Sequence, residues 1–183
     1  MSEPRASVEL ETPLGKILIE VDPAAAPISA ANFMRYVDEG RYDGACFYRT
    51  MRREHGSPGR EMELVQGGLA YDPERSLPPI AHESPAHTGL LHVEGAVSLA
   101  RREPGSASSE FFICMASCPQ LDPTDRPTPP ADGLGYAVFG RVVAGMDVAR
   151  RIQAQPTSDA ADSELLRGQM LESPVVIMRA SRL

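Results

Sequence analysis

Seventeen prolines are spread along this 183-residue chain, about twice the usual share of roughly 5 %. Proline has no main-chain N–H to donate and its ring clashes with the preceding helical turn, so it interrupts helices and the inner strands of sheets. The regular structure of the chain must therefore come in short segments. The length is typical of one domain, and we predict a single domain over residues 1–183, with residues 1–6 as a disordered tail.

Strand-like segments dominate the pattern. Apolar and polar residues alternate over 8–10 and again over 17–21, as expected for half-buried strands. Between them, Pro13 and Gly15 occupy the second and fourth positions of a turn, so this part of the chain predicts an antiparallel hairpin. Six further strand-like segments cover residues 45–49, 62–66, 96–100, 111–115, 136–143 and 175–179.

Only two segments have the spacing of a helix. In the first, Pro27 suits the first helical position, and apolar residues follow three and four positions apart until Gly40. The second extends over 146–155 and ends before Pro156. Eight short strands and two helices predict a mainly β fold, a closed or nearly closed β-barrel with helices covering its ends.

The chain is acidic, with 25 Asp and Glu against 18 Lys and Arg and a net charge of −7. Nucleic acids and anionic membranes bind surfaces rich in Lys and Arg, so neither is an expected partner. No apolar segment approaches the roughly 18 residues of a membrane-spanning helix, and the first residues do not resemble a signal peptide. We therefore expect a cytoplasmic protein, although a periplasmic protein whose signal peptide had been removed would have the same sequence.

No metal ion or cofactor is predicted. His82, His87 and His92 recur every five residues, a spacing that aligns them on neither a helix nor a strand, so we expect exposed loop histidines. The three cysteines, an odd number, argue against a disulfide framework, and their apolar surroundings predict burial. The chain also lacks the motifs of nucleophile elbows, phosphate-binding loops and zinc proteases.

Several segments, in order along the chain, resemble one known family. They are PISAANFMRYVDEGRYDG at 27–44, FYR at 47–49, VQGG at 65–68, GAVSLAR at 95–101, SASSEFFIC at 106–114, LD at 121–122 and GYAVFGRVVAGMDVARRI at 135–152. Together with the first hairpin and the last strand they cover nearly the whole chain. On these motifs the chain resembles the cyclophilins, a family of peptidyl-prolyl cis–trans isomerases, and especially their bacterial branch.

The resemblance implies a closed eight-stranded antiparallel barrel capped by two α-helices, with a site on its outer face. It places catalytic roles on Arg49 in FYR, Gln66 in VQGG and Phe112 in EFFIC. Since neighbouring residues of a strand face opposite ways, Phe112 can line the site only if Phe111 enters the core. The implied substrate-binding residues are Leu64, Ala100, Arg101, Leu121, Tyr136 and, next to an insertion, Met62.

The implied reaction needs no nucleophile, proton transfer or cofactor. An X-Pro bond rotates slowly, across a barrier of about 20 kcal/mol, because the nitrogen lone pair is delocalised onto the carbonyl group. A hydrogen-bond donor near the prolyl nitrogen favours the twisted state, and an arginine is such a donor at every working pH. The expected substrates are proline-containing peptides or unfolded protein chains.

The chain departs from the family pattern at four places, and two of them, Glu63 and an insertion, favour an alternative function. Glu63 stands where an aromatic residue is usual, and its carboxylate could pair with Arg49 and draw it from the substrate. Glu110 replaces a usual glutamine, Gln120 replaces a tryptophan that accompanies tight cyclosporin binding, and residues 52–60 form an insertion. We expect weak cyclosporin binding and a monomer. The alternative to an active isomerase is a weakly catalytic or non-catalytic binding module or chaperone for proline-containing segments.

Overall fold

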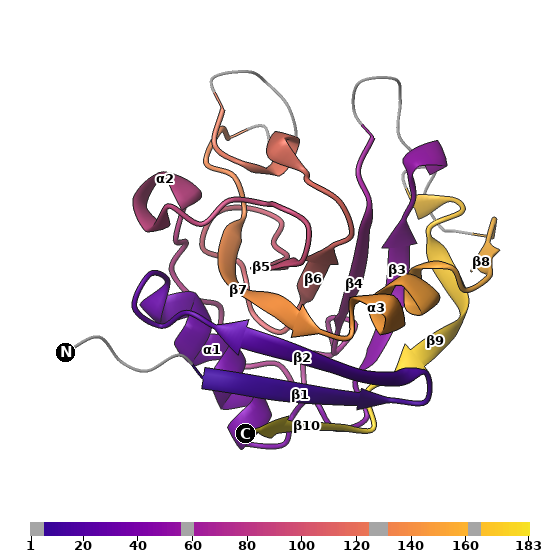
Figure 1. The fold of residues 1–183 in the computed structure, drawn as a ribbon. Coiled ribbons are helices and arrows are strands. Elements are labelled where there is room, and N and C mark those ends of the chain that lie inside the picture. The colour runs from indigo at the N-terminus through magenta and orange to yellow at the C-terminus, as the bar shows by residue number, and fades with distance from the viewer. Residues whose placement is uncertain (1–5, 56–60, 125–131, 161–165) are drawn as a thin grey trace.

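The computed structural model describes residues 6–55, 61–124, 132–160 and 166–183 (Figure 1). These residues form ten strands: β1 (Ala6–Thr12), β2 (Gly15–Val21), β3 (Cys46–Met51), β4 (Leu64–Gly68), β5 (Ala96–Leu99), β6 (Phe111–Cys114), β7 (Ala137–Ala144), β8 (Thr157–Ser158), β9 (Met170–Val176) and β10 (Arg179–Arg182). The helices among them are α1 (Pro27–Asp38), α2 (Pro85–Thr88), α3 (Met146–Gln153) and two short 3-10 helices, η1 (Arg53–His55) and η2 (Pro119–Leu121). The chain is therefore mainly β, as the sequence predicts.

The ten strands form one antiparallel sheet that curves around a common interior (Figure 1). Their order is β10-β1-β2-β7-β5-β6-β4-β3-β9-β8, and the end strands β10 and β8 do not pair with each other within the described residues. The predicted closed barrel of eight strands is therefore corrected to an open sheet of ten. The two additional strands escape prediction because β8 has two residues and β10 has one buried side chain, so neither shows apolar alternation.

The first hairpin is confirmed. β1 and β2 pair from Ala6 opposite Val21 to Thr12 opposite Gly15, and the alternating apolar residues Val8, Leu10, Ile17, Ile19 and Val21 face the core. Ala6 is thus part of the sheet, so the predicted disordered tail is wrong at this residue. Residues 1–5 of that tail lie outside the described residues.

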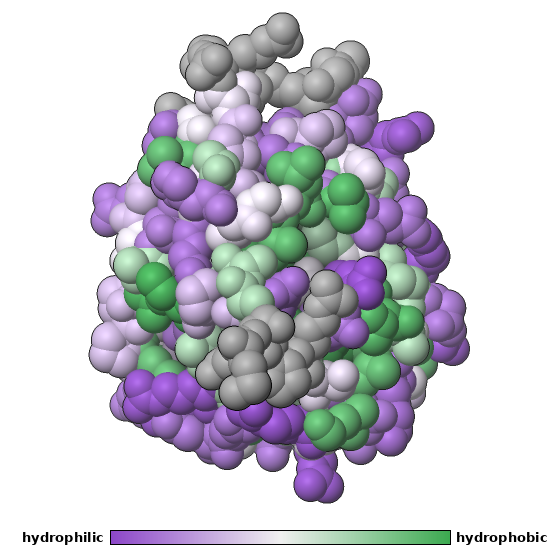
Figure 2. Space-filling view, turned by 60° about the vertical axis from the view of Figure 1, so that its left-hand side comes forward, coloured by the Kyte–Doolittle hydropathy of each residue, from purple (hydrophilic) through white to green (hydrophobic). Residues whose placement is uncertain are grey.

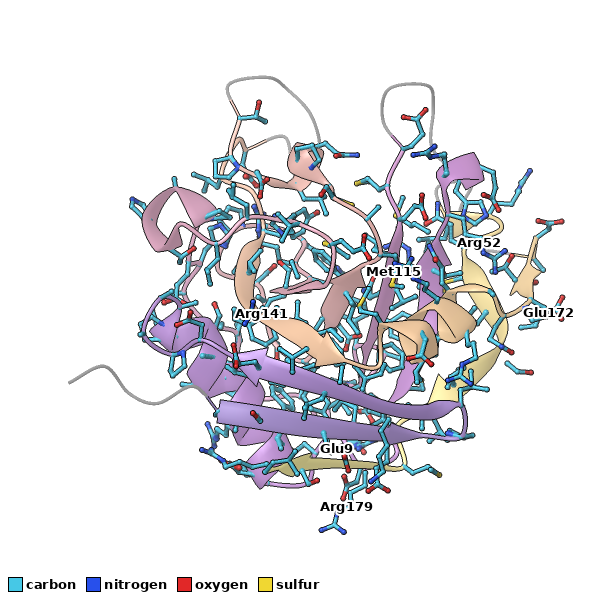
Figure 3. All side chains as sticks on the ribbon, in the orientation of Figure 1. Glu9, Arg52, Met115, Arg141, Glu172 and Arg179 are labelled. Atoms are coloured by element: carbon cyan, nitrogen blue, oxygen red, sulfur yellow. The ribbon has the colours of Figure 1, made fainter. Side chains whose placement is uncertain are left out.

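Two of the helices cover the sheet, as predicted. α1 packs against β7 and β10, and its Phe33 ring lies 4.8 Å from Phe139 and 5.5 Å from Phe111 between centroids. α3 packs against β2, β3 and β4 and is two residues shorter than the predicted 146–155. The core between them also holds Met115 (Figure 3). The third helix, α2, is a single turn and has too few residues for a periodic signal.

Polar and apolar residues alternate in patches over the face shown in Figure 2. The exposed apolar side chains of the molecule include Leu91 and Val93, which are 52 % and 54 % exposed. Of the helices formed by the described residues, none has both the length and the apolar character that crossing a membrane requires.

Candidate active site

A bulge in β3 places two neighbouring side chains on the same outer face. Phe47 and Arg49 both pair with β4, Arg49 lying opposite Gln66, whereas Tyr48 between them has no partner in this pairing. Phe47 and Thr50 are fully buried in the strand, so the bulge leaves both Tyr48 and Arg49 facing outwards. Without the extra residue, strand alternation would place these two side chains on opposite faces.

Three side chains fix the Arg49 guanidinium. Nη1 donates to Gln66 Oε1 at 3.0 Å, Nε and Nη2 donate to Gln169 Oε1 at 3.0 and 2.8 Å, and Nη2 contacts Met51 Sδ at 3.6 Å. Within the described residues, the second N–H of Nη1 is left without a partner. Burial lowers the pKa of Arg49 from its ordinary value, yet arginine remains a cation at every working pH. The site thus holds an oriented cation with one donor left for a ligand.

Gln169 is the residue of this site that the sequence analysis misses. Its main-chain oxygen accepts a hydrogen bond from Thr50 N at 2.8 Å, and Met170 pairs with Arg49 across the sheet. The side chain is buried and reaches Arg49 from 120 positions away in the sequence. No local spacing connects residues so distant, and only the pairing of β9 with β3 brings them together.

A second apolar cluster lies beside Gln66, apart from the main core. Phe112 is opposite Gln66 in the pairing of β4 with β6, and its ring meets Tyr136 edge-on at 5.7 Å between centroids. Phe111 is in the main core, as strand alternation predicts. Six predicted site residues gather in this cluster, namely Leu64, Phe112 and Leu121, which are buried, and Met62, Ala100 and Tyr136, which are partly buried.

His92 packs against the apolar cluster. The prediction of an exposed histidine is wrong for this residue. Its side chain is fully buried, with Nδ1 2.7 Å from Asp122 Oδ1 and Nε2 3.0 Å from Ser98 Oγ. The imidazole is nearly parallel to the Phe112 ring at 5.9 Å. Because Ser98 is fully buried as well, this Ser–His–Asp array presents no nucleophile to a substrate. It holds the Phe112 side of the cluster in place.

The remaining histidines and cysteines form no ligand set. His82 is half-buried and His87 is exposed, and no three His, Cys, Asp or Glu side chains of the described residues are grouped to hold a metal ion. All three cysteines are free thiols. Cys114 and Cys118 are buried, as predicted, whereas Cys46 is only partly buried.

Arg101 braces the segment that leads into β7. Its buried side chain donates to both carboxylate oxygens of Asp132, at 2.8 and 3.0 Å, and to Gly135 O at 2.7 Å. The guanidinium carbon also lies 5.1 Å from the centre of the Tyr136 ring. The main-chain N–H and C=O of Arg101 have no hydrogen-bond partner within the described residues. Its main chain can therefore pair with an extended peptide.

The predicted ion pair of Glu63 with Arg49 is wrong. Glu63 Oε1 lies 3.7 Å from Arg53 Nε, and Arg49 donates only to uncharged groups. Strand geometry explains the difference, since a residue three positions from Gln66 faces the other side and lies about 10 Å along the strand. The carboxylate therefore does not draw the guanidinium away from the site.

The 52–60 insertion is anchored at its first residue. Arg52, beside the end of α3 in Figure 3, donates to Gln153 O at 2.8 Å and to Gln155 O. Residues 56–60 lie outside the described residues. Near the insertion, the Gln120 side chain donates to Glu61 O at 2.6 Å.

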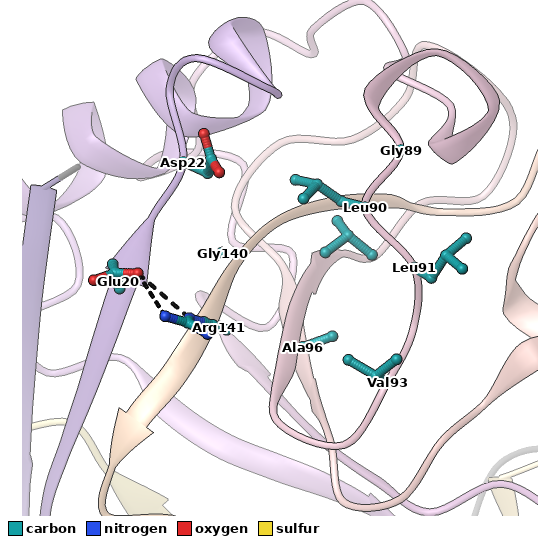
Figure 4. Close-up of a pocket in the computed structure, with 10 residues that line it drawn as sticks. Glu20, Asp22, Gly89, Leu90, Leu91, Val93, Ala96, Gly140 and Arg141 are labelled. Carbon is teal, nitrogen blue, oxygen red and sulfur yellow. Dashed lines mark hydrogen bonds and ion pairs between the residues drawn. The ribbon is translucent and has the colours of Figure 1, made fainter. Parts of the chain in front are cut away.

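Two cavities are large enough to be candidate sites. The first has a volume of 530 Å³, and its lining includes Arg49, Gln66, Tyr48, Tyr71 and Met170. The second, of 390 Å³, has apolar walls from 89–96 and a Glu20–Arg141 ion pair of 3.1 Å at its rim (Figure 4). Of these two cavities, only the first is lined by both a cation and a side-chain amide, those of Arg49 and Gln66, and so it is the candidate active site.

These features define a class of protein. An oriented arginine and a glutamine beside an apolar cluster, on the outer face of a curved antiparallel sheet, suit a site that binds a peptide without breaking a bond. Comparison with known proteins agrees. The family model described as "Cyclophilin type peptidyl-prolyl cis-trans isomerase/CLD" matches residues 7–181.

Curated relatives are similar over most of their length. The chain is 35 % identical over 178 residues to peptidyl-prolyl cis-trans isomerase cyp18 of Streptomyces antibioticus, covering 96 % of this chain and 97 % of that one. It is 36 % identical over 177 residues to peptidyl-prolyl cis-trans isomerase A of Dickeya dadantii, covering 94 % and 82 %. The chain therefore belongs to the cyclophilin-type peptidyl-prolyl cis–trans isomerases, and isomerisation of X-Pro bonds is its activity, as the sequence predicts.

A solved structure agrees in fold. A cyclophilin-type isomerase of Cryptosporidium parvum superposes with a TM-score of 0.72 at 18 % identity, covering 98 % of both chains. A second structure of that protein, in the presence of the dipeptide Ala-Pro, gives a TM-score of 0.71 at 18 % identity, covering 96 % of this chain and 97 % of that one. The open ten-stranded sheet thus has the cyclophilin fold.

Proposed function

We propose that Arg49 is the catalytic residue of this isomerase and acts on proline-containing segments of peptides and unfolded proteins. The observation that carries the proposal is the tethered guanidinium, which keeps one Nη1 N–H free beside the apolar cluster. The cavity beside it is large enough for a few peptide residues. The related structure obtained with Ala-Pro supports a proline-containing ligand for this fold.

The roles follow from what each group offers. The cluster around Phe112, Leu121 and Tyr136 buries the pyrrolidine ring, while Gln66 and the main chain of Arg101 hold the peptide beside it. The carbonyl group before proline then turns, and the prolyl nitrogen regains its lone pair as conjugation is lost. Arg49 donates to that nitrogen most strongly in the twisted state, and this difference lowers the barrier.

The test compares wild type with Arg49→Ala in NMR exchange measurements on a short X-Pro peptide. Losing one charged hydrogen bond is expected to lower kcat/KM by about 10- to 100-fold. Peptide binding, measured separately by chemical-shift titration, should change much less, because the cluster and Gln66 remain.

Arg53→Ala is the matched control. It also removes a cation near the site, but Arg53 is exposed and contacts only Glu63 among charged groups of the described residues. Its kcat/KM should stay within about twofold of wild type, in line with a surface ion pair of little energetic weight. An equal loss of turnover and binding in Arg49→Ala would sink the catalytic assignment.

The alternative function has lost its main support. A non-catalytic binding module was favoured by a Glu63–Arg49 pair that the structure does not contain. We also propose weak cyclosporin binding, because Gln120 is polar and its side chain is engaged with Glu61 O, and a calorimetric titration with cyclosporin tests it. We further propose that the protein is a monomer, which gel filtration tests, and that it is cytoplasmic, which cell fractionation tests.

A further inference from the structure

A chain of hydrogen-bonded side chains connects a buried carboxylate to Arg49. Glu110 is 1 % exposed, and its Oε2 accepts a hydrogen bond from the Tyr48 hydroxyl. Gln66 Nε2 donates to Tyr48 Oη at 3.0 Å, and Arg49 Nη1 donates to Gln66 Oε1 at 3.0 Å. No charged side chain of opposite sign contacts Glu110 within the described residues, so its charge is balanced by hydrogen-bond donors alone.

The direction of every bond in this chain is determined. Glu110 Oε1 accepts from Leu69 N at 3.0 Å, Tyr71 N at 3.2 Å and Ser109 Oγ at 2.8 Å. A carboxylate has no proton to give, so the Tyr48 hydroxyl must donate to it. The Tyr48 oxygen can then accept only from the amino group of Gln66, which turns the Gln66 carbonyl oxygen towards Arg49.

We propose that Glu110 is a positioning residue that acts through Tyr48 to set the amide orientation of Gln66 and the guanidinium orientation of Arg49. This inference rests on the proposed role of Arg49 in isomerisation. In this orientation the Gln66 carbonyl oxygen holds Arg49, and Arg49 keeps one Nη1 N–H for the prolyl nitrogen. Glu110 thus determines which hydrogen-bonding atoms the substrate meets.

The main chain around Glu110 is shaped to bury it. Gly68 has φ +140°, and a side-chain carbon there would lie 2.6 Å from Ser109 O and 2.8 Å from the Glu110 carboxyl group. Ala70 and Tyr71 also have positive φ values, 53° and 60°, which non-glycine residues seldom adopt. The two N–H bonds to Glu110 hold this turn, so the carboxylate orders both the turn and the side-chain relay.

Replacing Glu110 by glutamine should reverse the relay. The N–H groups of Leu69 and Tyr71 are fixed, so the new amide must turn its oxygen to them and its amino group to Tyr48. Tyr48 then donates to Gln66, which must turn its own amino group towards Arg49. A donor faces a donor, and the bond between Gln66 and Arg49 is lost.

The experiment is a double-mutant cycle of Glu110→Gln and Tyr48→Phe, with kcat/KM from X-Pro peptide exchange. Glu110→Gln alone is expected to lower kcat/KM by about tenfold, the effect of one hydrogen bond to a charged group. In the Tyr48→Phe background the relay is already cut, and Glu110→Gln should then change kcat/KM by less than about threefold. Equal effects in both backgrounds would overturn the proposal.

Three further measurements separate positioning from stability. Ser109→Ala also removes a hydrogen bond from Glu110 but leaves the relay direction unchanged, so its kcat/KM should stay within about twofold of wild type. The side-chain amide resonances of Gln66 should shift in Glu110→Gln and not in Ser109→Ala. If Glu110→Gln folds poorly, Tyr48→Phe alone decides, because an unchanged kcat/KM and unchanged Gln66 resonances would refute the relay.

Failure of this inference is distinguishable from failure of the proposed function. If Arg49→Ala retains full activity, the catalytic assignment falls and the relay has no role to support. If Arg49→Ala is inactive while Glu110→Gln acts independently of Tyr48, only the relay is refuted. In the Arg49→Ala background, Glu110→Gln should have no further effect on the residual rate.

Discussion

At the scale of single residues, the orientation of Arg49 depends on its two glutamine partners. Gln66 comes from the neighbouring strand and Gln169 from the C-terminal part of the chain, and both are uncharged acceptors. A carboxylate would hold the guanidinium more firmly, but its charge would cancel the field that favours the twisted substrate. Neutral acceptors therefore suit a cation that must remain available to a ligand.

Gln169→Ala is predicted to impair catalysis without abolishing it. The substitution removes the acceptor of two Arg49 N–H groups, so kcat/KM in the exchange measurement should fall by about 3- to 10-fold, less than in Arg49→Ala. Gln155→Ala is the control, because the partly buried Gln155 amide donates to Arg151 O and not to Arg49, and it should leave the rate unchanged. A wild-type rate in Gln169→Ala would mean that Gln66 positions Arg49 unaided.

At the scale of elements, the segment between η2 and β7 is tied to the site at its described ends. Tyr136 N donates to Leu121 O at 3.0 Å, and Arg101 binds both Asp132 and Gly135 O. Tyr136 and Leu121 both belong to the apolar cluster. The buried arginine therefore links the segment to the cluster that would hold proline.

The Arg101–Asp132 pair predicts a pH dependence of stability. The hydrogen bond from Arg101 lowers the pKa of Asp132 below its ordinary value of 3.8. A lowered folded-state pKa adds stability that is present above pH 3.8 and is lost as the pH falls through the folded-state value. The difference in free energy of unfolding between wild type and Asp132→Asn should therefore be constant from about pH 5 to 7 and shrink below about pH 4.

Urea denaturation at a series of pH values measures this difference. Asp147→Asn is a suitable control, since Asp147 forms an exposed pair with Arg151 on α3, and such pairs add little stability. A gap between wild type and Asp132→Asn that widens towards acid pH would contradict the assigned direction.

At the scale of the whole molecule, the turn between β7 and α3 packs closely against the first hairpin at Gly145. This residue joins β7 to α3 with φ +87°, and a side-chain carbon there would lie 2.2 Å from Lys16 O and 2.9 Å from Ile17 Cα. The turn thus passes directly over β2 and lets α3 bury Val148 and Ile152 against the sheet. Only glycine allows so close an approach of two main-chain segments.

Gly145→Ala and Gly44→Ala are a matched pair for testing this contact. Both glycines have similar positive φ values, 87° and 77°, but nothing lies within 4 Å of a side-chain carbon at Gly44. Gly44→Ala should therefore lower the free energy of unfolding by about 1–2 kcal/mol, the cost of the left-handed conformation alone. Gly145→Ala should cost about 3 kcal/mol or more, because main-chain atoms must also move, and equal denaturation midpoints would rule out the crowding.

Much of the fold and part of the site could be predicted because their signals are local. Period-two alternation predicted the first hairpin and placed Phe111 in the core and Phe112 on the opposite face. The helical spacing identified the buried face of α1. The ordered motifs identified the family. These features depend on residues a few positions apart, whose relative directions follow from backbone geometry.

The sequence by itself thus determined a mainly β chain, its two covering helices and its family, because short-range periodicity and motif order are written into neighbouring residues. Only the tertiary structure decided that the sheet stays open, that His92 is buried and that Glu63 pairs with Arg53. It also decided the placement of Gln169 and Glu110 around the site. The contacts of Arg49 depend on strand register and on the bulge in β3, and a bulge reverses the direction of every later side chain without leaving a signal in local composition.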